Sequence, residues 1–465
     1  ASPEGARAVW VLDVISHDPL GLFEVLADAR TGQVLRKRST MRDVDGTVYS
    51  TNPTVGKLIT GTLQGLTSTK ATLDGEHASV SSCSYTSGKV ECKQYALADT
   101  KGNFIYTPSE GKFDDAFSEV NAYYHVDTFH RYLNKSFGFK RQGKTGIEVM
   151  VNLHSVQNGQ KKGMANAFFG DLNGDSTGDL VFGQGSLDFA YDGDVIYHEF
   201  THSAVEETSN LTVAMDSLGF NATPAAINEG FADIFSSFHA GDPVVGDYMK
   251  STGIRNISGN AVCPDFLNGE SHNDGMLWGR AIWTIRGALQ DTTVFDAAVY
   301  TVMAGLSKNA GFDDAAKLLS ATLKAKDATL AAAADAELKK RGVDTCTRIL
   351  PLKPAQVRTF YAYGLSIAPS LKAIPGPFQY KIDVPAKATS MTIYVQKVYG
   401  YGGGMGAYIR VGKTVGYDYY GPQYDHVKDS QSAAITLSTA DTTGKLKLMP
   451  GTSYYVLPLS TSNYT

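Results

Sequence analysis

The feature that most constrains this sequence is the pair of histidines in His198-Glu-Phe-Thr-His202. The surrounding residues 194–205 have helical character, and a helix places side chains four residues apart on one face. Two neutral imidazoles in this arrangement can chelate one metal ion, and zinc suits them well. Glu199 directly follows the first histidine, so it is turned off the ligand face and can reach a water on the ion. The motif therefore predicts a hydrolytic zinc centre with Glu199 as general base.

A second helix, predicted over residues 223–238, is expected to supply the third zinc ligand. A Thr-Pro pair is typical of its start, and Glu229 and Asp233 lie four residues apart on a face other than the apolar one. Two adjacent carboxylates repel each other unless a cation or a histidine compensates them. We therefore predict that Glu229 binds zinc with His198 and His202, and that Asp233 is hydrogen-bonded to a ligand histidine.

These two helices, with His-Glu-Phe-Thr-His followed by Ile-Asn-Glu-Gly-Phe-Ala-Asp, resemble the thermolysin-like metalloproteases and their fungalysin-like relatives. The resemblance covers roughly residues 110–365. It implies an α+β fold with two lobes, a β-rich N-lobe that includes the active-site helix and a helical C-lobe.

Three further segments carry the same resemblance: Asn166-Ala-Phe-Phe, Gly253-Ile-Arg-Asn-Ile and Glu270-Ser-His-Asn-Asp-Gly. The resemblance implies that Asn166 and Ala167 bind the substrate backbone. It implies that Arg255 holds a substrate carbonyl and that His272 stabilises the oxyanion of the transition state. It also makes Asn228, with Asp233, a partner of the ligand histidines.

The sequence departs from the family pattern in two places. Phe220 stands where thermolysin has a tyrosine that assists the oxyanion, so His272 or another tyrosine must carry more of that role. The paired calcium site of the family looks incomplete, because Ala240 replaces a glutamate. Asp194, Asp242 and Asp247 could still contribute to it.

A separate Gly/Asp-rich segment is a second calcium candidate. It offers oxygen donors at alternate positions with glycines between them, which resembles a calcium loop. The usual closing glutamate is absent, so a solvated loop is the competing interpretation. The candidate ligands are Asp171, Asn173, Asp175, Thr177 and Asp179.

The four cysteines are Cys83, Cys92, Cys263 and Cys346. The first two bracket a predicted hairpin with its turn at Ser-Gly, so a disulfide between them would staple it. The other two would then pair by elimination, although four cysteines allow three connectivities. Four reduced core thiols are the alternative.

The chain is expected to contain four parts. They are a propeptide-like β segment (1–50), the catalytic N-lobe with the active-site helix (51–205), the helical C-lobe (206–366) and a C-terminal β-sandwich (375–465). The first resembles the end of the propeptide of such proteases, which implies a zymogen. The last resembles bacterial pre-peptidase C-terminal domains and is expected to follow a linker at 367–377. Its strands are expected at 380–384, 391–395, 407–411 and 454–457.

The composition excludes several classes of protein. With 43% hydrophobic and 19% charged residues the chain is not wholly disordered, and its net charge of −5 argues against a nucleic-acid partner. No apolar run reaches the roughly 18 residues of a membrane helix. There is no initiator Met or apolar leader at Ala1, so we expect that a targeting segment has been removed from a secreted protein.

The sequence thus predicts a secreted zinc endopeptidase whose partners are protein or peptide substrates and its own propeptide. One alternative is an aminopeptidase, although we find no Gly-Ala-Met-Glu-Asn-type segment to hold a substrate amine. Another is a binding or adhesion protein on an inactive protease scaffold. The intact ligand set and Glu199 argue against that alternative.

Overall fold

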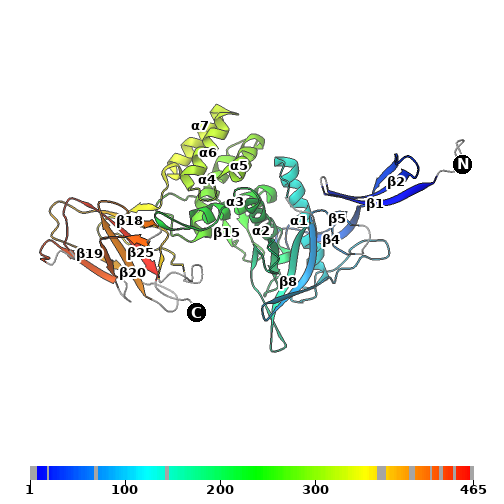
Figure 1. Ribbon diagram of the computed structural model, residues 1–465, viewed down its shortest axis with the longest axis horizontal. Coiled ribbons are helices and arrows are strands. Elements are labelled where there is room, and N and C mark those ends of the chain that lie inside the picture. Colours follow the sequence, from blue (N-terminus) through cyan, green and yellow to red (C-terminus); the bar gives the residue numbers. More distant parts are fainter. Residues whose placement is uncertain are drawn as a thin grey trace. The chain divides into compact units, whose positions relative to one another are not determined.

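The computed structural model describes residues 8–17, 20–67, 72–141, 146–363, 373–396, 404–418, 421–428, 433–442 and 447–460. By its contacts the chain forms two compact units (Figure 1). The first unit consists of Ala1–Glu207 and Ala232–Asn256, and the second of Thr208–Phe231 and Ile257–Thr465. The helix α3 (Thr223–Ala240) begins in the second unit and ends in the first. The predicted range 206–366 therefore contains residues of both units.

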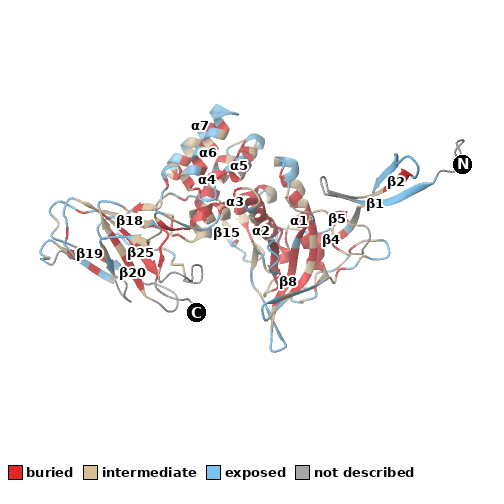
Figure 2. Cartoon of the chain, in the orientation of Figure 1, coloured by how far each residue is buried: buried red, intermediate tan, exposed pale blue. Residues whose placement is uncertain are grey.

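A six-stranded mixed sheet forms the centre of the first unit. Its order is β10-β11-β8-β6-β7, with β9 beside β8, and β6 and β11 run parallel to β8. Strand β8 is buried along most of its length (Figure 2), which agrees with the apolar residues of its first half. The bounds are β6 (Ala78–Thr86), β7 (Lys89–Lys93), β8 (Ile147–Gln157), β9 (Gln160–Gly163), β10 (Ala167–Gly170) and β11 (Asp179–Gly183).

Two helices pack beside this sheet. Helix α1 (Ala116–Phe137) contacts β6 and β8, and α2 (Gly193–Glu206) contacts α1 and β10. Asp115 caps α1 by accepting the N–H of Phe117, and Gly138 ends the helix with a left-handed φ of 77°. These local signals fix where α1 starts and stops.

The carboxylate of Glu119 is a buried polar junction between α1 and the sheet. It accepts the N–H and hydroxyl of Ser82 and the N–H groups of Tyr95 and Ala96 at 2.6–3.1 Å. Burial raises the pKa of Glu119, although these hydrogen bonds act in the opposite direction. The side chain therefore provides the acceptor for several donors in the interior of the unit.

The remaining strands of the first unit form small antiparallel sheets. The first three form the sheet β1-β2-β3, and several of their apolar side chains, such as Trp10 and Val11, are exposed. The assignment of residues 1–50 to a propeptide stays a prediction. The bounds are β1 (Val9–His17), β2 (Leu20–Asp28), β3 (Val34–Ser39), β4 (Arg42–Tyr49), β5 (Leu58–Leu66), β14 (Val244–Val245) and β15 (Arg255–Asn256).

Helices and a β-module make up the second unit. A hairpin of β12 (Ala214–Asp216) and β13 (Gly219–Asn221) precedes α3. The helices that follow are α4 (Ser271–Gly287), α5 (Thr293–Gly305), α6 (Phe312–Lys324) and α7 (Ala328–Lys340). Among the described residues of this region, Val343–Thr345 is the last helical turn, so the helical pattern predicted to about residue 366 is wrong for residues 346–363. A strand, β16 (Ile349–Pro351), follows instead.

We call residues 348–363 and 373–460, which include strands β16–β25, the C-terminal β-module. Its main sheet has the order β16-β18-β25-β20-β23, with β17 beside β25, and two further pairs are β19–β24 and β21–β22. The four strand predictions at 380–457 are confirmed. Part of the predicted linker, 367–370, lies outside the described residues, and residues 374–375 form a strand. The bounds are β17 (Ile374–Pro375), β18 (Gln379–Asp383), β19 (Ser390–Val395), β20 (Met405–Val411), β21 (Gly416–Asp418), β22 (Gly421–Gln423), β23 (His426–Lys428), β24 (Ala433–Ser438) and β25 (Ser453–Ser460).

Both disulfides have the expected pairing. Cys83 and Cys92 lie opposite each other on β6 and β7, and the turn between these strands contains Ser87 and Gly88, both with positive φ. Cys263 is bonded to Cys346, 83 residues away within the second unit. Across the described ranges, none of the helices combines the length and the apolar character that crossing a bilayer requires.

We expect Glu119→Ala to lower the free energy of unfolding by about 3 kcal/mol, because it leaves several buried donors without an acceptor. Chemical denaturation measures this loss. Glu206→Ala, at an exposed position of α2, is the matched control and should change stability by less than about 0.5 kcal/mol. Equal effects of the two substitutions would contradict the assignment of Glu119 as a buried junction.

Candidate metal centre and active site

Packing against α1 fixes the rotation of α2. The Tyr197 ring stacks on Phe129 at a centroid distance of 4.9 Å, and its hydroxyl lies 2.6 Å from Nδ1 of His125. Burial lowers the pKa of His125 to about 3, so this histidine stays neutral. Because Tyr197 faces α1, the next residue, His198, is turned about 100° around the helix axis, and His202 lies one turn further on the same face.

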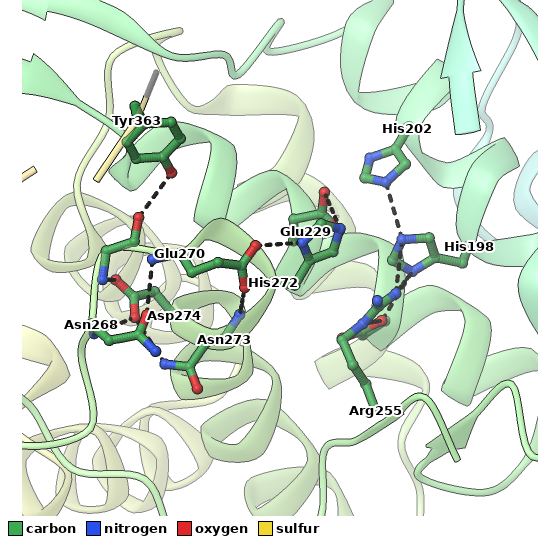
Figure 3. A network of polar contacts seen from close by, with 12 residues as sticks. His198, His202, Glu229, Arg255, Asn268, Glu270, His272, Asn273, Asp274 and Tyr363 are labelled. Atoms are coloured by element: carbon green, nitrogen blue, oxygen red, sulfur yellow. Dashed lines mark hydrogen bonds and ion pairs between the residues drawn. The ribbon is translucent and has the colours of Figure 1, made fainter. Parts of the chain in front are cut away.

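The two motif histidines point at one another. Their Nε2 atoms are 3.1 Å apart and their rings are nearly perpendicular (Figure 3). Two nitrogens bound at about 2.0–2.1 Å to one tetrahedral zinc ion would be roughly 3.3 Å apart, so the observed separation fits a shared ion. In the described ranges, one group of three His, Cys, Asp or Glu side chains has its ligand atoms within 4.8 Å of each other. It consists of His198, Glu199 and His202.

Asp233 holds the first histidine from behind, as the sequence predicts. Its Oδ1 atom is 2.9 Å from Nδ1 of His198, and both its oxygens accept Nε–H of Arg255 at 2.9 Å. Burial raises the pKa of Asp233, but Arg255 and His198 outweigh burial and hold the pKa below its ordinary value. An ionised Asp233 fixes the proton of His198 on Nδ1 and leaves the Nε2 lone pair for a metal ion.

Arg255 also contacts the imidazole directly. Its Nη2 atom is 3.1 Å from Nδ1 and 3.0 Å from Nε2 of His198. A nitrogen equally far from both ring nitrogens lies on the lone-pair axis of neither. The guanidinium therefore lies off the Nε2 direction that a metal ion would use.

In the second unit, His272 on the first turn of α4 lies between two carboxylates (Figure 3). Its Nε2 atom is 3.4 Å from Oε1 of Glu229, and its Nδ1 atom is 2.7 Å from Oε1 of Glu270. The other oxygen of Glu270 accepts the N–H of Asn273 and caps α4. The predicted role of Asn228 stays a prediction, and its amide donates to the carbonyl of Leu211 at 3.1 Å.

The loop in front of α4 is held by its own helix and by a tyrosine further along the chain. Asp274 accepts the N–H groups of Asn268 and Gly269, each at 2.8 Å. The hydroxyl of Tyr363 donates to the carbonyl of Gly269 at 2.8 Å. Phe220, at the position expected for an oxyanion tyrosine, is buried in β13 with its ring 4.5 Å from that of Tyr363.

Comparison with known proteins decides the relationship. Residues 60–206 match the catalytic domain of the thermolysin metallopeptidases. Over these residues the chain is similar to thermolysin. An extracellular elastase of Staphylococcus epidermidis is 25% identical over 250 residues, which are 50% of this chain and 43% of the relative. Bacillolysin of Bacillus amyloliquefaciens is 23% identical over 237 residues, 47% of this chain and 38% of the relative. The chain thus spans less than half the length of either relative.

The residues predicted to bind the substrate backbone lie at a sheet edge. Ala167 begins β10, the edge strand next to β11, and Asn166 directly precedes it. The carbonyl of Asn166 accepts the N–H of Gly183, while its side chain is exposed. An edge strand offers free backbone groups with which an extended peptide can pair.

The predicted calcium loop directs its oxygens toward its own backbone. Asp171 accepts the N–H groups of Gly174, Asp175 and Ser176, and Asp175 accepts the N–H and the hydroxyl of Thr177. Asn173 accepts the N–H of Asp175, and Asp179 accepts that of Leu172. These bonds stabilise the loop without an ion.

A more deeply buried set of carboxylates lies elsewhere in the first unit. It consists of Asp192, Asp194, Asp242 and Asp247. Neither oxygen of Asp194 has a hydrogen-bond partner, and burial followed by the charges of the other three raises its pKa. The side chain of Asn52 donates to Asp247 at 2.6 Å.

Sequence reasoning missed two residues of the site, Glu270 and Tyr363. The sequence analysis gave Glu270 no role, although it lies in the same segment as His272. A Glu immediately before a helix can cap it, and this is the signal that could have identified it. No local signal singles out Tyr363, because it is far in sequence from the loop that it binds. The contact of Arg255 with Asp233 and His198 was not predicted either.

We expect Asp233→Asn to weaken zinc binding by roughly 10-fold or more, because the neutral amide orients and polarises His198 less well. Competition with a fluorescent zinc chelator measures the dissociation constant. Asp296→Asn is the matched control, since Asp296 forms a comparable pair with Arg286 on another part of the chain. Identical zinc affinity in the two variants would refute the role assigned to Asp233.

Proposed function

We propose that this chain is a secreted, zinc-dependent endopeptidase in which His198, His202 and Glu229 bind the metal. The observation that carries the proposal is the approach of the two Nε2 atoms to 3.1 Å, with Asp233 hydrogen-bonded behind His198. Glu229 lies one helical turn before Asp233 on α3, which supports its assignment as third ligand. The names of the two relatives, an extracellular elastase and a bacillolysin, agree with this proposal.

The side chains present fit the chemistry of peptide hydrolysis. Zinc, when bound, would polarise the scissile carbonyl and lower the pKa of a water molecule to near 7. Glu199, which is largely buried beside both histidines, takes the proton of the attacking water and passes it to the leaving amine. A carboxylate that is kept out of bulk water is well suited to both steps.

Four further residues would bind and stabilise the substrate. His272 donates to the developing oxyanion, and Glu270 orients it for this task. Asn166 and Ala167 bind the substrate backbone along the edge of β10. Arg255 holds a substrate carbonyl through its guanidinium.

The remaining parts of the proposal concern organisation. We infer that the catalytic part has two lobes, that residues 1–50 are a propeptide segment and that the C-terminal β-module is a sandwich. Two disulfides are consistent with an oxidising, extracellular location.

We also propose that the chain binds calcium. The set Asp192, Asp194, Asp242 and Asp247 supports this better than residues 171–179, because both oxygens of the buried Asp194 lack a hydrogen-bond partner, whereas most oxygens of residues 171–179 accept hydrogen bonds from the loop itself. A calcium ion needs six to eight oxygens at 2.3–2.6 Å, so its binding would draw these carboxylates closer together. An ion would relieve the repulsion that raises the pKa of Asp194.

We expect Glu199→Gln to retain zinc and fold while losing peptidase activity by a factor on the order of 100 or more, because the amide cannot accept the proton of the water. The assay follows an N-blocked internally quenched peptide, with zinc content measured on the same samples. Glu206→Gln on the same helix serves as the control. Near wild-type turnover by Glu199→Gln would exclude it as the base, and cleavage confined to peptides with a free N-terminus would identify an aminopeptidase.

We expect Ca²⁺ to raise the melting temperature more at pH 8 than at pH 5. A carboxyl group with a raised pKa stabilises the folded state at low pH, and this stabilisation is lost as the pH rises through the folded-state value. Calcium would offset that loss by compensating the ionised carboxylates. Differential scanning fluorimetry of Asp194→Asn should show no calcium effect, whereas Asp175→Asn should behave like the wild type. The reverse result would assign the ion to the acidic loop.

A further inference from the structure

The C-terminal β-module contacts two short segments that lead directly into residues of the proposed active site. One is the β12–β13 hairpin, which ends two residues before the helix that carries Glu229. The other is the loop 264–270, which ends where α4 begins, one residue before His272. Both segments and the β-module belong to the second unit.

Polar side chains and backbone groups join the β-module to the hairpin. The buried amide of Gln379 on β18 donates to the carbonyls of Leu218 and Val415 at 3.1 and 2.7 Å and accepts the N–H of Val415 at 2.9 Å. The N–H of Tyr417 on β21 donates to the carbonyl of Ser217 at 2.8 Å. Gln379 therefore bridges β18, the start of β21 and the hairpin.

Two further contacts fix the hairpin. Arg348, at the start of β16, forms an ion pair with Asp216 and donates to the carbonyl of Phe220 at 2.9 Å. Phe220 and Ala222 form a buried cluster with Ile374 of β17, and Tyr363 packs against this cluster. The hairpin is thus held by an ion pair, hydrogen bonds and apolar contacts at once.

The loop 264–270 is held in a similar way. The N–H of Tyr361 donates to the carbonyl of Asn268 at 2.6 Å, and the hydroxyl of Tyr363 donates to the carbonyl of Gly269. Gly269 has a φ of 85°, and a Cβ atom there would lie 2.2 Å from the side chain of Pro377. The close approach of the β-module thus requires glycine at this position.

We propose that the C-terminal β-module is an integral part of the active site, and that Tyr363 and Gln379 are positioning residues that act through His272 and Glu229. This inference rests on the proposed peptidase function. Tyr363 holds the loop that carries Glu270, and Glu270 in turn holds His272. Gln379 holds the hairpin from which α3 starts. A module that merely followed the catalytic part would need no such contacts with the segments in front of both residues.

The size of the effect follows from how strongly a catalytic rate depends on position. A displacement of about 1 Å at a group that stabilises the transition state can lower the rate by up to about 100-fold. Loss of one of several contacts to the loop should shift His272 by less than this. We therefore expect an effect on kcat rather than on KM or on zinc content.

The first test is Tyr363→Phe, which removes the hydroxyl and retains the ring that packs on Phe220. We expect kcat to fall 3- to 10-fold, with KM within 2-fold and with unchanged zinc content and melting temperature. Tyr394→Phe is the matched control, since Tyr394 lies on β19 of the same module with its side chain mostly exposed. Equal kcat values for the two variants would overturn the role of Tyr363.

A double-mutant cycle tests whether Tyr363 acts through His272. In the His272→Ala background, Tyr363→Phe should change kcat by less than 1.5-fold, because the residue that it positions is absent. A full 3- to 10-fold loss in that background would show that the effect does not pass through His272 and would overturn the inference.

Hydrogen exchange gives a measurement that does not need activity. Tyr363→Phe should accelerate exchange of the Asn268 and Gly269 amides, and Gln379→Met should accelerate exchange in residues 214–221. Unchanged exchange in both variants overturns the positioning role even if the protein is a peptidase. A wild-type chain that binds zinc but cleaves no peptide overturns the proposed function. In that case, accelerated amide exchange in the two variants would still support the coupling of the C-terminal β-module to these two segments.

Discussion

The ion pair of Asp233 with Arg255, shared with His198, is the interaction on which the rest of the site depends. Asp233 is completely buried, and an isolated carboxylate in that position would be strongly unfavourable. A guanidinium on one side and an imidazole N–H on the other compensate its charge. The same contacts fix the orientation of the His198 ring. The groups that compensate the buried charge of Asp233 therefore also orient the proposed metal ligand.

Two helices supply the residues that surround this interaction. Helix α2 is fixed by the aromatic contact between Tyr197 and Phe129, and its other face presents His198 and His202. Helix α3 provides Asp233 and, one turn earlier, Glu229. Four-residue spacing sets both pairs, but Asp233 on α3 holds His198 on α2, so a rotation of either helix would disturb this contact.

The second unit shows how remote segments can determine the position of His272, which we propose to be catalytic. His272 is held by Glu270, and the loop before Glu270 is held by Asp274 from α4 and by Tyr363. Tyr363 also packs on Phe220, next to the start of α3. The proposed coupling between the C-terminal β-module and the active site follows from this series of short contacts. Thermolysin-like chains with other C-terminal modules need not share it.

The sequence by itself predicted the two helices of the site, the paired histidines and the Cys83–Cys92 hairpin, because each depends on spacing within a short segment. Asp233 as the partner of a ligand histidine was also predicted, since charge compensation limits what adjacent carboxylates can do. Only the tertiary structure decided which side chains meet across long separations. Arg255 on Asp233, Glu270 on His272 and Tyr363 on Gly269 are of this kind. Their contacts depend on loop paths and on the pairing of β16 with β18, for which no short-range pattern exists.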